Sequence, residues 1–198
     1  METVSEMLVK KMTDRGVIVP EKREVYKTGI MLLLADMINF ALVLLIGILC
    51  GALYESALYL LMMWTVRRFS GGYHAKTYGR CRAVTVGTYI LVLISENLIS
   101  DNFAVIALVC NAFAIVTVFV FSPVRHPNRE LTEKERKANR LFAGLATLFF
   151  AAASTVLTAL DRKEGLAISL ILLAIAVLMY AGMLANGKEG KRHVKDHR

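Results

Sequence analysis

Residues 103–122 read FAVIALVCNAFAIVTVFVFS and contain no charged side chain. An α-helix needs about 20 such residues to cross the roughly 30 Å hydrocarbon core of a bilayer. Further apolar runs of similar length lie on both sides of this one, and hydrophobic residues make up 56% of the 198-residue chain. That fraction is above the roughly 45–50% of soluble globular domains. The sequence therefore predicts an integral membrane protein.

The fold class predicted from these runs is an all-α polytopic bundle of about six transmembrane helices with an amphipathic N-terminal segment. The expected spans are residues 29–50, 52–66, 83–99, 103–122, 141–160 and 166–185. The second is short and carries Glu55, so we expect a tilted or partly buried helix there. The whole chain, 1–198, is expected to form one integral membrane domain: an amphipathic segment (1–28), the bundle (29–185) and a basic tail (186–198).

Apolar side chains recur at helical spacing near the N-terminus, at Met1, Val4, Met7, Leu8 and Met12. Gly16 and Pro20 break this pattern. A helix of this kind can lie in the membrane interface or dock on a peptide partner, and it can equally be a solvated helix.

Lysine and arginine are concentrated in alternate connections between the spans. They are frequent in residues 1–28, 67–82, 123–140 and 186–198. The connections near 51, 100–102 and 161–165 are short, and their only basic residues are Arg162 and Lys163. Since positive residues favour the cytoplasmic side, both termini and the 67–82 loop are expected in the cytoplasm.

The 67–82 loop reads RRFSGGYHAKTYGRCR and combines five basic residues with an imidazole and a thiol. A cysteine attacks acyl groups as the thiolate. Arg80, Arg82 and the start of the following helix should favour that form of Cys81, because positive charge and a helix N-terminus stabilise an anion. His74 can act as a base near neutral pH. The pair could therefore carry out nucleophilic acyl transfer.

Helix geometry restricts this pairing. In an unbroken α-helix, His74 and Cys81 would share a face but stand about 10.5 Å apart along the axis. We therefore expect the helix to start close to Cys81 and the preceding chain to turn back, which Gly71, Gly72 and Gly79 permit. The two side chains could also meet from two subunits.

The remaining reactive groups allow other interpretations. Cys50 and Cys110 fall inside apolar runs and are expected in the core, and no metal or cofactor is expected because His74, Cys81 and His126 form no ligand motif. Intramembrane acids are often functional. Three acids fall within spans, namely Asp36, Glu55 and Glu96. They suit helix packing, or the polar path of a small transporter or peptide-export channel. A membrane scaffold without enzymatic activity is a third alternative.

The pattern Arg67-Arg68-x2-Gly71-Gly72-x-His74-Ala75-x5-Cys81 resembles the AgrB family, membrane cysteine endopeptidases that process precursors of cyclic peptide pheromones in Gram-positive bacteria. The likeness extends to chain length, hydropathy, the amphipathic start and the Pro123-Val124-x2-Pro127-Asn128 stretch. It covers most of the chain.

The resemblance implies a catalytic pair of His74 and Cys81. It also implies that Arg67 and Gly72 are functionally sensitive. Arg68 and Lys76 of the same loop are expected to bind the substrate or support its binding. The resemblance further implies quorum-sensing chemistry on an AgrD-like precursor peptide. Cys81 would release the precursor's acidic C-terminal tail through an acyl-enzyme thioester and promote (thio)lactone cyclisation. The expected setting is the lipid of the bacterial cell membrane, as a homodimer, with no nucleic-acid partner.

Overall fold

The computed structural model describes residues 2–72, 77–99, 101–124 and 132–196, and every regular element in them is helical. The elements in order are α1 (Glu2–Asp14), a 3-10 turn η1 (Pro20–Lys22), α2 (Arg23–Cys50), α3 (Leu53–Met62), a π-helical segment η2 (Met63–Arg67), α4 (Arg68–Ser70), α5 (Tyr78–Leu98), α6 (Phe103–Phe121), α7 (Glu133–Ala159) and α8 (Glu164–Asp196). The predicted all-α polytopic fold is confirmed.

Five helices are long and apolar enough to cross a membrane, namely α2, α5, α6, α7 and α8. The predicted second span is the exception. It corresponds to α3, η2 and α4, which follow one another without a break over residues 53–70. These three elements have ten, five and three residues, so none of them alone reaches the roughly 20 residues of a membrane-crossing α-helix.

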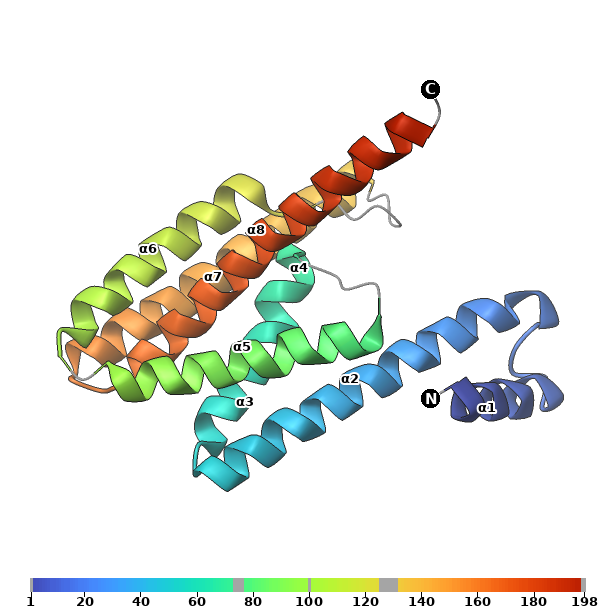
Figure 1. Ribbon diagram of the computed structural model, residues 1–198, viewed down its shortest axis with the longest axis horizontal. Coiled ribbons are helices and arrows are strands. Elements are labelled where there is room, and N and C mark those ends of the chain that lie inside the picture. The colour runs from blue at the N-terminus through green and yellow to red at the C-terminus, as the bar shows by residue number, and fades with distance from the viewer. Residues whose placement is uncertain (1, 73–76, 100, 125–131, 197–198) are drawn as a thin grey trace.

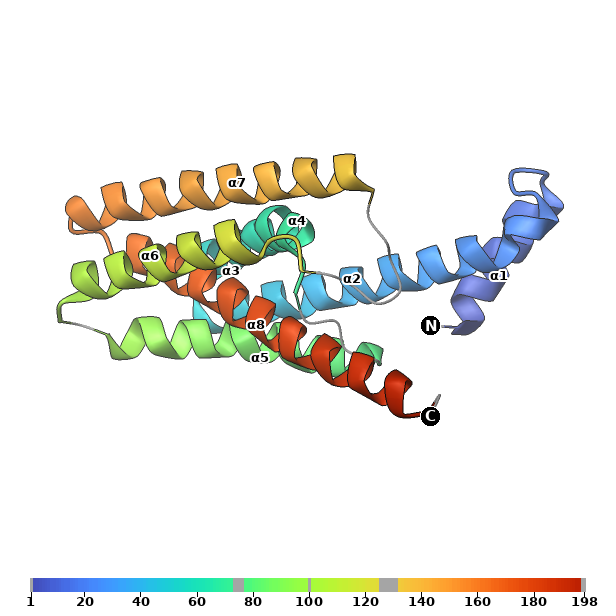
Figure 2. The same ribbon diagram turned by 90° about the horizontal axis from the view of Figure 1, so that it is seen from above.

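Three helices, α6, α7 and α8, pack side by side and form the tightest part of the molecule, while α5 packs on α8 and α2 packs on α3 and α5 (Figures 1 and 2). Apolar residues of α8 such as Ile171 and Ile175 are buried in the main core. Polar contacts join the same three helices: the Asn111 amide donates to the Ser154 hydroxyl (3.0 Å), which donates to the Gly165 carbonyl (2.7 Å). The helices therefore meet through close packing around small residues.

The helix ends sort to opposite ends of the bundle. The starts of α2, α5 and α7 and the ends of α6 and α8 point one way, and the α2–α3, α5–α6 and α7–α8 connections lie at the other end (Figures 1 and 2). The helix ends that adjoin the basic segments of the sequence therefore gather at one end of the bundle.

The predicted N-terminal helix is confirmed as α1, which lies beside the start of α2 (Figure 1). Lys27 donates to Glu6 at 2.6 Å, and this bond lowers the pKa of the Glu6 carboxyl. Ser5 and Val9 are the buried residues of α1, whereas Met7 is 63% exposed. The apolar stripe read from the sequence thus faces away from the bundle, which suits a membrane interface.

Candidate functional site

Cys81 lies in the first turn of α5 as a half-buried free thiol. Thr77 is the N-cap residue, with extended dihedrals (φ −131°, ψ 145°). Its carbonyl accepts the Cys81 N–H at 3.1 Å, and its hydroxyl accepts the Arg80 N–H at 3.4 Å. The helix starts at Tyr78, earlier than the predicted residue 83. The prediction that Cys81 stands near a helix N-terminus is nevertheless confirmed.

His74 and Lys76 lie outside the described residues, so the distance between the imidazole and the thiol stays a prediction. The chain on either side of them is described. Gly72 has φ 151° and Thr77 is extended, so residues 72–82 do not form one straight helix. His74 and Cys81 are therefore not separated by a fixed helical rise, as the dyad requires.

Gly71 and Gly72 connect α4 to the α6–α8 part of the bundle. Gly71 has φ 73°, and a Cβ there would stand 3.0 Å from the Val124 carbonyl oxygen. The Val124 N–H donates to the Ser70 carbonyl at 2.9 Å. Gly72 faces the backbone of Leu178 in α8, where a Cβ would be at 3.4 Å. Gly71 combines a left-handed φ with a close backbone approach, so a side chain there would strain the turn, whereas at Gly72 the positive φ is what disfavours a side chain.

Arg67 and Arg68 lie where η2 passes into α4. The Arg68 guanidinium is 5.9 Å from the centroid of the Trp64 ring, and an Arg67 Nη1 lies 3.8 Å from the Met63 sulfur. Both arginines also act electrostatically on Asp36 of α2. From the sequence, Asp36 was expected to serve in helix packing or in a polar path and was not paired with the arginines, because nothing in a separation of about thirty residues indicates that they are neighbours.

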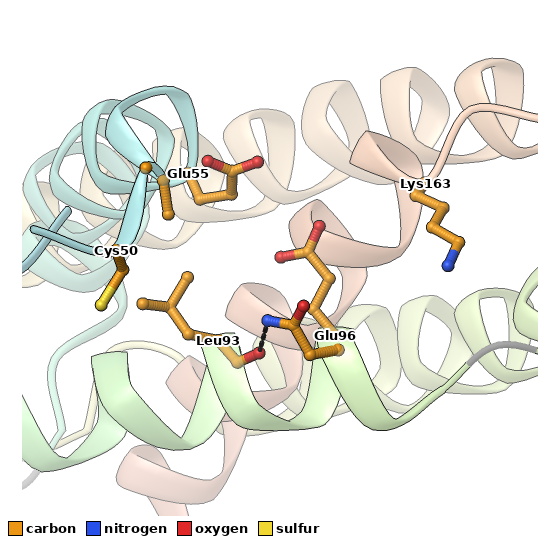
Figure 3. A pocket seen from close by; sticks show the side chains of 8 residues that line it. Cys50, Glu55, Leu93, Glu96 and Lys163 are labelled. Carbon is orange, nitrogen blue, oxygen red and sulfur yellow. Dashed lines mark hydrogen bonds between the residues drawn. The ribbon is translucent and has the colours of Figure 1, made fainter. Parts of the chain in front are cut away.

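The other acids within spans lie at the opposite end of the bundle. Figure 3 shows Glu55 and Glu96 facing a common pocket, with Lys163 on its far side. Cys50 also lines this pocket and is exposed, so its expected core position is wrong. The reason is that α2 ends at Gly51, which places Cys50 in the last turn. Cys110 is buried, as expected.

This pocket holds about 230 Å3, below the roughly 300–1,000 Å3 of small-molecule sites. Asp36 does not line it and precedes Cys50 by fourteen residues, about 21 Å along α2. Asp36 is therefore well separated from the pocket that Glu55 and Glu96 share. In the same residues, no group of three His, Cys, Asp or Glu side chains is placed to hold a metal ion.

Comparison with known proteins gives one consistent family. The family model for accessory gene regulator B (AgrB) matches residues 2–183. An AgrB-like protein 2 of Clostridium perfringens strain 13 is 26% identical over 146 residues, covering 69% of this chain and 67% of the relative. The AgrB-like protein of Listeria monocytogenes serotype 4a is 25% identical over 154 residues, covering 76% and 74%.

The AgrB-like protein of Listeria welshimeri is 26% identical over 140 residues, covering 69% of this chain and 67% of the relative. No solved structure matches the chain. The family match runs from α1 into α8 and so includes every helix that adjoins the candidate site. This multi-pass membrane protein belongs to the accessory gene regulator B family, whose members are peptidase-like processing proteins of the agr system.

Proposed function

We propose that the protein is a membrane cysteine endopeptidase that removes the C-terminal tail of an AgrD-like pheromone precursor. Cys81 is the nucleophile and His74 its base. The observation that carries the proposal is the position of Cys81 in the first turn of α5, directly after a stretch that is not one continuous helix. A partly exposed thiol at the positive end of a helix dipole suits a nucleophile.

The reaction proceeds in two acyl transfers. The Cys81 thiolate attacks the carbonyl carbon before the tail, the C–N bond breaks, and the imidazolium of His74 protonates the leaving amine. A thioester between Cys81 and the shortened precursor remains. A thiol or hydroxyl of the precursor then gives its proton to the neutral imidazole of His74, attacks the thioester, closes a thiolactone or lactone and returns the thiolate to Cys81. Exchange of one thioester for another is nearly balanced in free energy, so a thiolactone can form without ATP provided that the released tail is removed.

The basic residues at the same end of the bundle attract the acidic tail. Arg67 and Arg68 stand at the close of η2, and the chain carries a formal net charge of +8. Like charges gathered at one end steer an oppositely charged peptide toward it. Lys76, which lies in the same basic stretch of the sequence, adds a further positive charge. Gly72 holds the loop against α8 so that the motif keeps its place.

We place the basic end of the bundle, with both termini, in the cytoplasm, following the positive-inside rule. Cys50 and Cys81 lie at opposite ends, so they report this orientation. A membrane-impermeant maleimide added to intact cells should label Cys50 and leave Cys81 unlabelled. Labelling of Cys81 alone would reverse the assignment. The protein acts as a homodimer in the lipid bilayer in this proposal.

Co-expression with an AgrD-like precursor tests the activity. Cys81→Ala and His74→Ala should each abolish tail release while the protein remains in the membrane at normal abundance. Cys50→Ala and Cys110→Ala should retain cleavage, because Cys50 lies at the far end of the bundle and Cys110 is in the core. Normal processing by Cys81→Ala would overturn the proposal.

A further inference from the structure

The half of α5 that carries Cys81 has no buried side chain. In the whole helix the buried residues are Tyr89, Val92 and Leu93, all in the second half. The first eleven residues, Tyr78–Thr88, are half-buried or exposed. Close packing against other helices therefore does little to fix this half, since membrane helices associate through close packing and interhelical hydrogen bonds. Other contacts must set where Cys81 stands.

A fully buried tyrosine of α3 supplies such contacts. The Tyr59 hydroxyl lies 2.8 Å from the Thr85 carbonyl oxygen and 2.6 Å from the Thr88 hydroxyl. Two arrangements of the hydroxyl protons satisfy the hydrogen bonding of Tyr59. Tyr59 donates to Thr85 and accepts from Thr88, or it donates to Thr88, which then donates to the Val84 carbonyl at 2.7 Å. Either arrangement ties α3 to the first half of α5.

A second hydroxyl pair, which lies one turn nearer the start of α3, also joins α3 to α5. Ser56 and Tyr89 share a hydrogen bond of 2.5 Å, and the rings of Tyr59 and Tyr89 pack at 5.1 Å between centroids. This pair joins the buried half of α5. The contact made by Tyr59 is the one nearer to Cys81.

The contact made by Tyr59 also sets the rotation of Cys81 about the helix axis. Cys81 precedes Thr85 by four residues and Thr88 by seven, so the three share one face of α5. The Thr85 carbonyl is one turn, about 6 Å, from Cys81. On the other side, α3 continues from Tyr59 through η2 to Arg67, about two turns away. Tyr59 thus joins the helix that bears Cys81 to the segment that bears Arg67.

We infer that Tyr59 is a positioning residue, whose hydroxyl holds the Cys81-bearing half of α5 at one depth and one rotation relative to Arg67. The inference rests on the proposed function of Cys81. Tyr59 touches neither the substrate nor the thiol. Its loss should lower the rate of acyl transfer by misplacing the thiol and leave the binding of the precursor unchanged.

Tyr59→Phe tests this inference because it keeps the ring and removes only the hydroxyl. Hydrogen bonds between membrane helices have modest strength, so we expect kcat per reactive Cys81 to fall about three- to twentyfold with KM within about twofold. Hydrogen exchange should speed up at the amides of residues 81–88 and stay unchanged in α8. A purely structural role would lower the yield and raise exchange in α8 without altering kcat per molecule.

Tyr54→Phe is the matched control, since Tyr54 is an exposed tyrosine of α3 and its hydroxyl makes none of the hydrogen bonds found in the described residues. Its kcat and its hydrogen exchange should match those of the wild type. Thr88→Val removes the partner hydroxyl from the α5 side and should lower kcat in the same way. The double variant Tyr59→Phe/Thr88→Val should lower kcat by less than the product of the two single fold-changes. Thr88→Val also serves if Tyr59→Phe fails to fold.

The outcomes separate the inference from the proposed function. Wild-type kcat and exchange in Tyr59→Phe, or in Thr88→Val where only that variant folds, overturn the positioning role while leaving Cys81 as nucleophile. Cleavage that persists in Cys81→Ala overturns the proposed function itself.

Discussion

Helices α8 and α5 occupy the bundle in different ways. In the apolar window of α8, 67% of the residues are buried, against 17% in α5. Aliphatic side chains of α8 lie in the main core, whereas the first half of α5 has no buried side chain and makes hydroxyl contacts with α3. The stability of the fold and the geometry of the candidate site therefore depend on different helices, and substitutions should separate them.

The largest expected contrast is between the thiols of Cys110 and Cys81. Cys110 is 7% exposed in the core that α6 shares with α8, and Cys81 is half-buried at the start of α5. Alkylation of Cys110 requires opening of the core, so it should be slower by about 1,000-fold or more. Peptide mass spectrometry during treatment of the folded protein with N-ethylmaleimide measures both rates. Similar rates would mean that the core is not closed as described.

A pair of glycines gives the next contrast. A Cβ on Gly165 of α8 would lie 2.6 Å from the Ser154 carbonyl oxygen, whereas a Cβ on Gly87 of α5 would meet nothing within 4 Å. Gly165→Ala should destabilise the protein by about 1–3 kcal/mol through overpacking. Gly87→Ala should be neutral or stabilise it by up to about 1 kcal/mol, because alanine favours a helix interior. Thermal unfolding in detergent compares them, and equal losses would contradict the difference between the two helices.

The smallest effect is expected from Asp36 of α2, which interacts electrostatically with Arg67 and Arg68. Asp36→Asn should reduce precursor cleavage about two- to fivefold, the range of exposed ion pairs, with thermal stability unchanged. Asp161→Asn is the control, since Asp161 lies at the α7–α8 turn far from the arginines. An unaltered cleavage rate in Asp36→Asn would show that the arginines are held without it.

Most of the fold could be predicted from sequence because it follows from long apolar runs and from the distribution of lysine and arginine. The predicted and observed starts of α6 coincide at Phe103. The second span was expected to be short, and it corresponds to the segment that the structure divides among α3, η2 and α4. What hydropathy could not show was its π-helical segment η2, which depends on how Met63–Arg67 pack against neighbours.

Less of the candidate site could be predicted, because its geometry depends on contacts between residues distant in the chain. The position of Cys81 near a helix start followed from the sequence. The link from Tyr59 to α5, the proximity of Asp36 to the arginines and the approach of Gly72 to Leu178 did not. Cys50 was misjudged, although the predicted span ended at residue 50, because apolar character does not show whether other helices cover a residue at a helix end.

Detection of an acyl-enzyme on Cys81 tests the central proposal most directly. Purified protein in lipid nanodiscs is mixed with an AgrD-like precursor, quenched in acid and digested for mass spectrometry. The account predicts that the shortened precursor is joined to the Cys81 peptide by a hydroxylamine-sensitive thioester. The adduct should be present in Cys50→Ala and Cys110→Ala and absent in Cys81→Ala. Tail release by Cys81→Ala, or an acyl group on a different residue, would contradict it.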